Sequence, residues 1–132
     1  MKRLIVLLAI IGICFMGCAT TQTGTTAPTW DQTATTAYEL TGATFSTAKT
    51  VLDITCAAGA IDAATCTKYA GIYKQAQEAY VIAGTALQAA IAISDAAQKQ
   101  TAIQAYNVAL AQLAPLAAQV MAMVAELKAK AQ

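Results

Sequence analysis

The sequence contains no histidine and only two serines, Ser46 and Ser94. A serine nucleophile needs a neighbouring base, most often histidine, so the sequence offers no triad for nucleophilic catalysis. The seven acidic residues are scattered, and none lies three or four positions from another, so no helical pair is placed to hold a metal or share a proton. Glycine-rich phosphate loops are missing as well. The sequence predicts a protein that is not an enzyme and that holds no metal or cofactor.

Charge is also scarce, because charged residues make up only 11% of the 132 residues. Lys2 and Arg3 lie at the N-terminus, and the remainder has six lysines against seven acidic residues, a net charge of −1. With this near-neutral charge, we expect no basic surface that would bind nucleic acid. Alanine inflates the hydrophobic fraction of 58%, and it favours helix but buries little surface. We therefore expect one all-α domain with a thin core.

The N-terminus has the organisation of a bacterial export signal. A short positive segment precedes the uncharged run Leu4–Phe15, which has the length of a signal-peptide hydrophobic region. The run is too short to span a bilayer core of ~30 Å, which needs roughly 20 residues. Gly17-Cys18 follows and resembles the lipobox of bacterial lipoproteins.

In that family the precursor is cleaved directly after a small residue. The cysteine that follows is acylated with palmitate-type chains and becomes the new N-terminus. The resemblance therefore implies cleavage after Gly17 and a lipid anchor on Cys18. Phe15 and Met16 depart from the usual lipobox, which predicts slower cleavage than average. A plain cysteine in an uncleaved signal anchor is the alternative interpretation.

The ten residues after Cys18, Ala19–Pro28, are uncharged and rich in threonine. Without apolar periodicity they indicate a tether, whose r.m.s. span would be roughly 18 Å. Ala19 in the position after the lipidated cysteine resembles the outer-membrane sorting pattern of enteric-type bacteria. We expect a signal peptide over 1–17, a lipidated tether over 18–28 and a helical domain over 29–132, on an outer membrane and facing the periplasm.

A first helix is predicted from Thr29, which with Gln32 forms a capping-box pattern. Its large residues recur every seven positions, as is typical of a helical stripe: Tyr38, Phe45 and Leu52. The helix should end near Ala57, where Gly59 can adopt the left-handed conformation that closes many helices.

The second helix is predicted to begin after Asp62 and the third after Asp95, since both aspartates suit the N-cap position. The second again has its large residues seven apart: Tyr73, Tyr80 and Leu87. The third alternates steps of three and four, as in a coiled-coil seam, at Ile103, Tyr106, Leu110, Leu113, Ala117, Val120, Val124 and Leu127. Pro115 cannot donate to the Ala111 carbonyl, so we expect a kink there.

Short connections favour antiparallel neighbours, so the three helices predict an up-down-up bundle. Folding at the two turns brings Tyr38, Tyr80 and Tyr106 to the same height, as core aromatics or, alternatively, as the lining of a ligand groove. A membrane hairpin is the rival architecture, because 107–125 and 81–93 are uncharged. The second stretch is too short to span, and insertion leaves the heptads unexplained.

Four cysteines are present. Cys14 would leave with the signal peptide, Cys18 would carry lipid, and Cys56 and Cys66 would remain as a pair in an oxidising compartment. The pair flanks the first turn, where a disulfide can form. Two thiols without histidine fall short of the four ligands that zinc prefers.

The layout as a whole resembles the small alanine-rich lipoproteins of phage and proteobacterial genomes, which implies a compartment rather than an activity. We expect a non-catalytic, membrane-anchored domain that binds an envelope protein or self-associates. One alternative is a carrier or sensor of a small apolar ligand. Another is a phage-encoded envelope protein that acts in superinfection exclusion or lysis.

Overall fold

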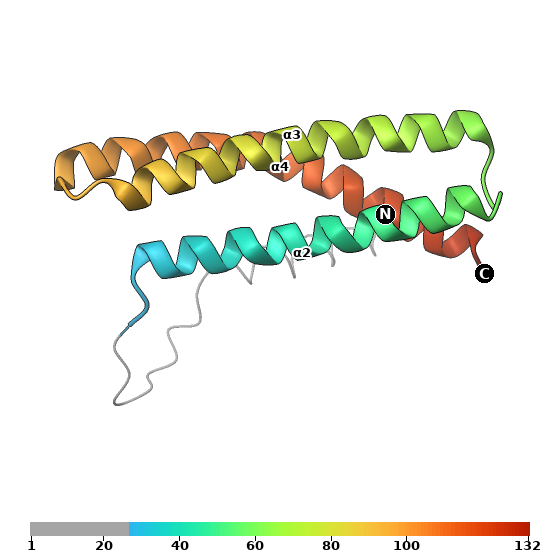
Figure 1. Cartoon of the computed structure of the whole chain (residues 1–132), viewed down its shortest axis with the longest axis horizontal. Coiled ribbons are helices and arrows are strands. Elements are labelled where there is room, and N and C mark those ends of the chain that lie inside the picture. Colours follow the sequence, from blue (N-terminus) through green and yellow to red (C-terminus); the bar gives the residue numbers. More distant parts are fainter. Residues whose placement is uncertain (1–26) are drawn as a thin grey trace, which may run out of the picture.

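A computed structural model describes residues 27–132, which form three long helices and no strand. Helix α2 spans Trp30–Ala57, α3 spans Ala63–Ala92 and α4 spans Ala96–Lys130. The helices lie alongside one another as an elongated bundle (Figure 1). The all-α prediction is confirmed for the described residues.

Local capping bonds set the helix starts, as predicted. The Thr29 side chain accepts from the Gln32 amide, and the Gln32 side chain accepts from the Thr29 amide, so both halves of the capping box are present. Asp62 accepts from the Thr65 amide at 2.8 Å, and Asp95 accepts from the Gln98 amide at 2.9 Å. These bonds satisfy backbone donors that have no partner in the first helical turn.

The turn between α2 and α3 depends on one glycine. Gly59 has a φ of 66°, a backbone conformation that costs a residue with a Cβ roughly 1–2 kcal/mol. Because the chain reverses there, Ile61 is returned to the core, where it is 9% exposed.

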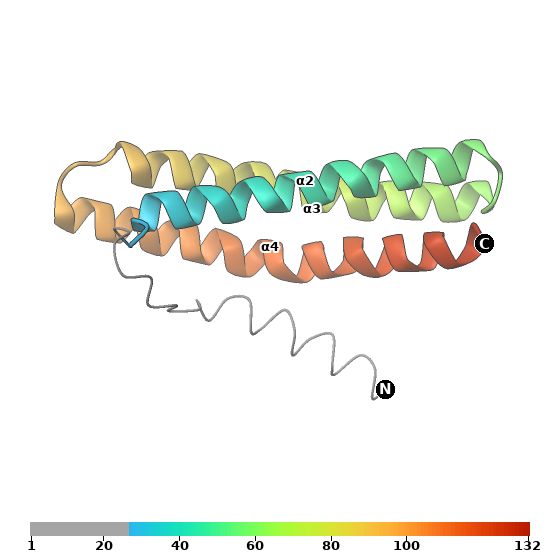
Figure 2. The same ribbon diagram turned by 90° about the horizontal axis from the view of Figure 1, so that it is seen from below.

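The contacts between helices run in a regular order. Tyr38 packs on Tyr80 and Phe45 packs on Tyr73. As the residue number rises along α2, the number of its partner in α3 therefore falls. Along α4 the order is the same as along α2, since Asp31 meets Lys99 near their N-terminal ends. Figure 2 shows both turns at the ends of the bundle, one at each end.

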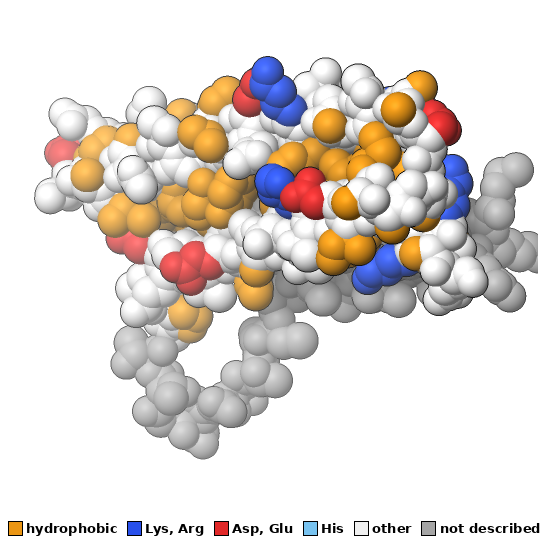
Figure 3. Space-filling view, turned by 45° about the vertical axis from the view of Figure 1, so that its right-hand side comes forward, with side chains coloured by type: hydrophobic (Ala, Val, Ile, Leu, Met, Phe, Trp, Pro, Cys, Tyr) orange, Lys and Arg blue, Asp and Glu red, His pale blue; other side chains and the backbone are white. Residues whose placement is uncertain are grey.

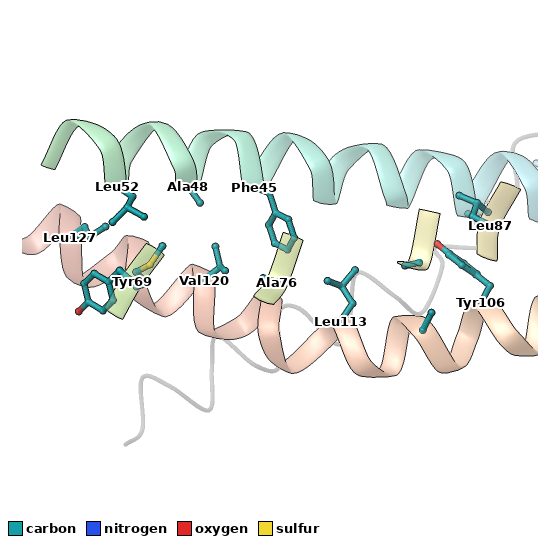
Figure 4. Close-up of a cluster of buried hydrophobic side chains, with 14 of the residues drawn as sticks. Phe45, Ala48, Leu52, Tyr69, Ala76, Leu87, Tyr106, Leu113, Val120 and Leu127 are labelled. Carbon is teal, nitrogen blue, oxygen red and sulfur yellow. The ribbon is translucent and has the colours of Figure 1, made fainter. Parts of the chain in front are cut away.

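The core is an elongated cluster of buried side chains between the helices (Figure 4). Three alanines of α3 spaced seven apart are fully buried: Ala76, Ala83 and Ala90. Larger residues of α4 with the same spacing pack into that core: Tyr106, Leu113, Val120 and Leu127. Because an alanine side chain is a single methyl group, this row allows α3 and α4 to approach closely, and their interface is the most extensive of the three.

The seam predicted for α4 needs one correction. Ala109 and Met123 are buried, at 7% and 3% exposure, whereas their neighbours Leu110 and Val124 on the predicted seam are only partly buried. Both sets flank the row of Tyr106, Leu113, Val120 and Leu127, and an apolar stripe on an α-helix is wider than a strict 3–4 alternation. The packing of α2 and α3 decides which residues beside this row of α4 are buried.

Helix α4 continues through Pro115 without interruption, and Pro115 is exposed. The kink expected there stays a prediction. Among the described residues α4 alone is long and apolar enough to cross a membrane by length and composition, a test that the core helix of a soluble bundle also passes.

Candidate functional site

The cysteine pair lies at the end of the bundle where α2 turns into α3. Cys56 occupies the last turn of α2, and Cys66 follows the N-cap Asp62 by four residues. Their Cα atoms are 5.9 Å apart and their sulfur atoms face each other at bonding distance. Disulfide-linked residues usually have Cα atoms roughly 4.4–6.8 Å apart, so the backbone can hold the bond without moving. Both residues are only half-buried.

Tyr38 of α2 and Tyr80 of α3 form the main lateral contact between these two helices. Their rings are stacked, with centroids 4.1 Å apart and planes within 2°. Each hydroxyl donates across the interface: Tyr38 Oη to the Tyr80 carbonyl at 3.2 Å, and Tyr80 Oη to the Tyr38 carbonyl at 3.1 Å. The contact is therefore reciprocal, and we call it the tyrosine interlock.

Two glycines make room for the interlock. A Cβ added at Gly42 would overlap the Tyr80 hydroxyl, and one added at Gly84 would overlap the Tyr38 hydroxyl. Each helix therefore contributes a tyrosine and, four residues later on the same side, the notch that receives the partner's tyrosine. Alanine at either glycine would have to displace a ring.

The interlock belongs to an internal repeat with an offset of 42 residues. Residues 34–48 and 76–90 match in five places, namely Ala34 with Ala76, Ala37 with Ala79, Tyr38 with Tyr80, Gly42 with Gly84 and Ala48 with Ala90. Sequence reasoning recognised the tyrosine heptads but not the glycines. The spacing Tyr-x3-Gly, present once in each of the first two helices, is the signal that would have identified them.

The third tyrosine of the predicted layer, Tyr106 on α4, lies outside the interlock. Tyr106 is 2% exposed and meets the edge of Trp30 at a centroid distance of 5.8 Å. Beside this contact the Lys99 ammonium donates to Asp31 at 2.9 Å, joining α4 to the start of α2. Tyr38 and Tyr80 therefore pack against each other, and Tyr106 packs against Trp30 at the same end of the core.

The electrostatics of the tyrosines favour their neutral form. Burial, with the hydrogen bond to Tyr80 as a second cause, raises the pKa of Tyr38 to about 12. Burial also raises the pKa of Tyr106. A tyrosine is a strong nucleophile or base only when ionised, and these two hydroxyls stay protonated at neutral pH. Their roles here are donation and packing.

Near the cysteine end, the Tyr69 phenol of α3 and the Glu126 carboxylate of α4 shift each other's pKa. Hydrogen bonding with Glu126, together with burial, raises the pKa of Tyr69 to about 12. The same hydrogen bond, with Lys130 as a further partner, lowers the pKa of Glu126. The pair therefore prefers a neutral phenol beside an ionised carboxylate.

Shallow hollows lie away from the tyrosines. One, of about 230 Å³, lies between α2 and α4 and is lined by Thr44, Thr47, Ala48, Val120, Met121, Val124 and Lys128. The other borders Asp31 and Ile91. From residue 27 to the C-terminus, no group of three or more Cys, Asp or Glu side chains is close enough to hold a metal ion.

The predicted cleavage and acylation site, Gly17 and Cys18, lies outside the described residues. No protein-family model matches the chain, and neither does any curated protein or solved structure.

Proposed function

We propose that the chain is a lipid-anchored bacterial envelope protein whose helical domain is not catalytic and acts by contact with another protein or with a second copy. The observation that carries the anchor is Gly17-Cys18 behind a short, uncharged run. Acyl chains on Cys18 would supply the membrane affinity, at about 0.8 kcal/mol per buried CH₂. Helix α2 begins at Trp30, and the uncharged, threonine-rich stretch 19–28 before it would serve as the tether. The proposed place is the outer membrane, facing the periplasm.

The proposed role in protein contact is supported by the surface. Large hydrophobic side chains are exposed on all three helices, with Leu40 at 65% and Val108 at 60%. Figure 3 shows hydrophobic side chains gathered along the line where two helices meet, while charged side chains form isolated spots. Interfaces are depleted of charge at their centres, and this surface has the composition to make one.

The proposal includes a disulfide between Cys56 and Cys66. Export would place both thiols in an oxidising compartment, and their Cα separation of 5.9 Å suits the bond. Closing the ten-residue loop should stabilise the domain by roughly 2–3 kcal/mol. Protein purified from the envelope should then have no thiol that reacts with an alkylating agent at Cys56 or Cys66 until it is reduced.

Metabolic labelling with palmitate in a bacterial host tests the anchor. We expect Cys18→Ala to abolish labelling and to accumulate uncleaved precursor, whereas Cys14→Ala, the matched control in the same segment, should label as the parent does. Label that persists in Cys18→Ala would refute the assignment. Fractionation of the labelled membranes then distinguishes the outer from the inner membrane.

Light scattering after size exclusion of the mature protein in detergent tests the mode of action. Self-association predicts a stable dimer or larger species beyond the mass of the micelle. A monomer that retains a bound apolar molecule, detected by mass spectrometry of its organic extract, would instead favour the carrier or sensor.

A further inference from the structure

The polar and aromatic contacts that hold α2 to the bundle are unevenly distributed along its length. The Asp31–Lys99 ion pair, the Trp30–Tyr106 contact and the tyrosine interlock all lie in its N-terminal half. Phe45, near the middle, still meets Tyr73 and Tyr80. Over residues 46–57, by contrast, the described part of the chain has no hydrogen bond or ion pair from α2 to α3 or α4. This C-terminal half is held by apolar contacts and by Cys56.

The same half borders one of the hollows of the bundle. The hollow of about 230 Å³ separates Thr44, Thr47 and Ala48 of α2 from the α4 residues that face them. Three side chains of this half are buried, namely Ala48, Leu52 and Thr55, at 1%, 5% and 4% exposure. Because packing energy depends on close contact, a seam with a hollow holds less firmly than a filled one.

Local sequence does not compensate for the loose seam. Residues 46–57 contain three threonines, Thr47, Thr50 and Thr55, each of which donates back to the carbonyl four residues earlier. Threonine has a lower helix propensity than alanine, and such back-bonding slightly weakens a helix. The cross-link at Cys56 is therefore the strongest constraint on the position of this segment.

We propose that Cys56 and Cys66 form a redox latch on the C-terminal half of α2. With the disulfide formed, residues 46–57 stay on the α3–α4 pair. With it reduced, this segment opens from α4 while the interlock keeps the N-terminal half in place. The inference rests on the disulfide of the proposed function, and the half-exposed positions of both cysteines make the bond accessible to a reductant.

The reductant is a dithiol, either small or borne by a protein. One of its thiolates attacks a sulfur of the Cys56–Cys66 bond, forming a mixed disulfide and releasing the other cysteine as a thiolate. Its second thiolate then displaces the remaining cysteine. The protein gains two electrons and two protons as two thiols, and the reductant becomes a disulfide.

Hydrogen exchange monitored by mass spectrometry tests the latch on the full chain in detergent. The chain is oxidised with glutathione disulfide or reduced with dithiothreitol before exchange. We expect reduction to speed exchange over 46–57 by on the order of tenfold or more. Exchange over 30–41 and over the core of α3 should change much less.

The double variant Cys56→Ser/Cys66→Ser keeps Cys14 and Cys18 and serves as the control. Its exchange over 46–57 should match that of the reduced parent and should not respond to dithiothreitol. Equal exchange in the oxidised and reduced parent would overturn the latch, and so would a uniform increase across all three helices. Free thiols at Cys56 and Cys66 after oxidation would overturn both the latch and the disulfide. Loss of the Cys18 anchor in the palmitate experiment leaves the latch result unaffected.

Discussion

Helix α2 and the α3–α4 pair are built from different residues and are held in different ways. Threonine supplies eight of the 28 residues of α2, whereas alanine supplies 22 of the 65 residues of α3 and α4. Alanine has the highest helix propensity and lets helices approach closely, while β-branched threonine loses side-chain freedom in a helix. The pair is thus held by continuous close packing, and α2 is attached by a few specific contacts. A helix with weak local propensity needs such contacts to keep its place.

The largest effect is expected in the α3–α4 pair. Leu113 is 3% exposed and lies in the row that packs against the core, so Leu113→Ala should cost roughly 2–5 kcal/mol of unfolding free energy. The neighbouring exposed residue provides the control, because Gln112→Ala should change stability by less than about 0.5 kcal/mol. Denaturant titration followed by circular dichroism measures both. Equal effects at the two positions would mean that the seam is misplaced.

The interlock gives the next largest effect, and it concerns α2. Gly42→Ala should destabilise the fold by roughly 1–3 kcal/mol, because the new methyl overlaps the Tyr80 hydroxyl. Gly71 is a matched control, since it lies within α3 with nothing inside 4 Å of an added Cβ. Gly71→Ala should therefore stabilise by about 0.5–1 kcal/mol.

A second substitution shows whether the overlap is the cause. Adding Tyr80→Phe to Gly42→Ala removes the overlapping hydroxyl and leaves the ring carbon that bears it 3.1 Å from the new methyl. Part of the lost stability should therefore return, although the hydrogen bond to the Tyr38 carbonyl is lost. Adding Tyr38→Phe should return none. Thermal melting of the two double variants measures the difference. Equal melting temperatures would refute overlap with the Tyr80 hydroxyl as the cause of the lost stability.

Alkaline pH should weaken both regions through different tyrosines. Tyr38 and Tyr69 have pKa values raised to about 12 in the fold, against about 10 in an unfolded chain. A raised pKa adds stability below pH 10 that is lost as the pH rises from about 10 to 12. Ultraviolet titration of tyrosinate should show late-ionising groups. Tyr38→Phe should remove one late-ionising group, and Tyr69→Phe should remove another. Titration curves of both variants that match the parent curve would contradict the assignment.

The smallest effect is expected at the ion pair that joins the start of α2 to α4. The Lys99 and Asp31 side chains are 27% and 35% exposed, so solvent screens their attraction, and Lys99→Ala should cost no more than about 1 kcal/mol. Its effect should shrink at high salt. A cost of 3 kcal/mol or more would mean that α2 depends on this pair rather than on the interlock.

Much of the secondary structure was predictable because capping is local. Thr29, Asp62 and Asp95 each bond to an amide three residues ahead, and Gly59 supplies the reversal that ends the first helix. The closeness of Cys56 and Cys66 in space also follows from their nearness in the chain, since only ten residues separate them. Such features need no knowledge of how the helices pack.

The interlock and the inward face of α4 could be known only from the tertiary structure. Tyr38 and Tyr80 are 42 residues apart, so the need for glycine at positions 42 and 84 appears only when α2 and α3 are placed in register. Met123 and Val124 are equally apolar neighbours, and α2 and α3 decide that Met123 is the one buried. The sequence alone determined where the helices begin and end, through contacts within one turn. Helix-to-helix register depends on close packing between distant residues, and it was decided only when all three surfaces met.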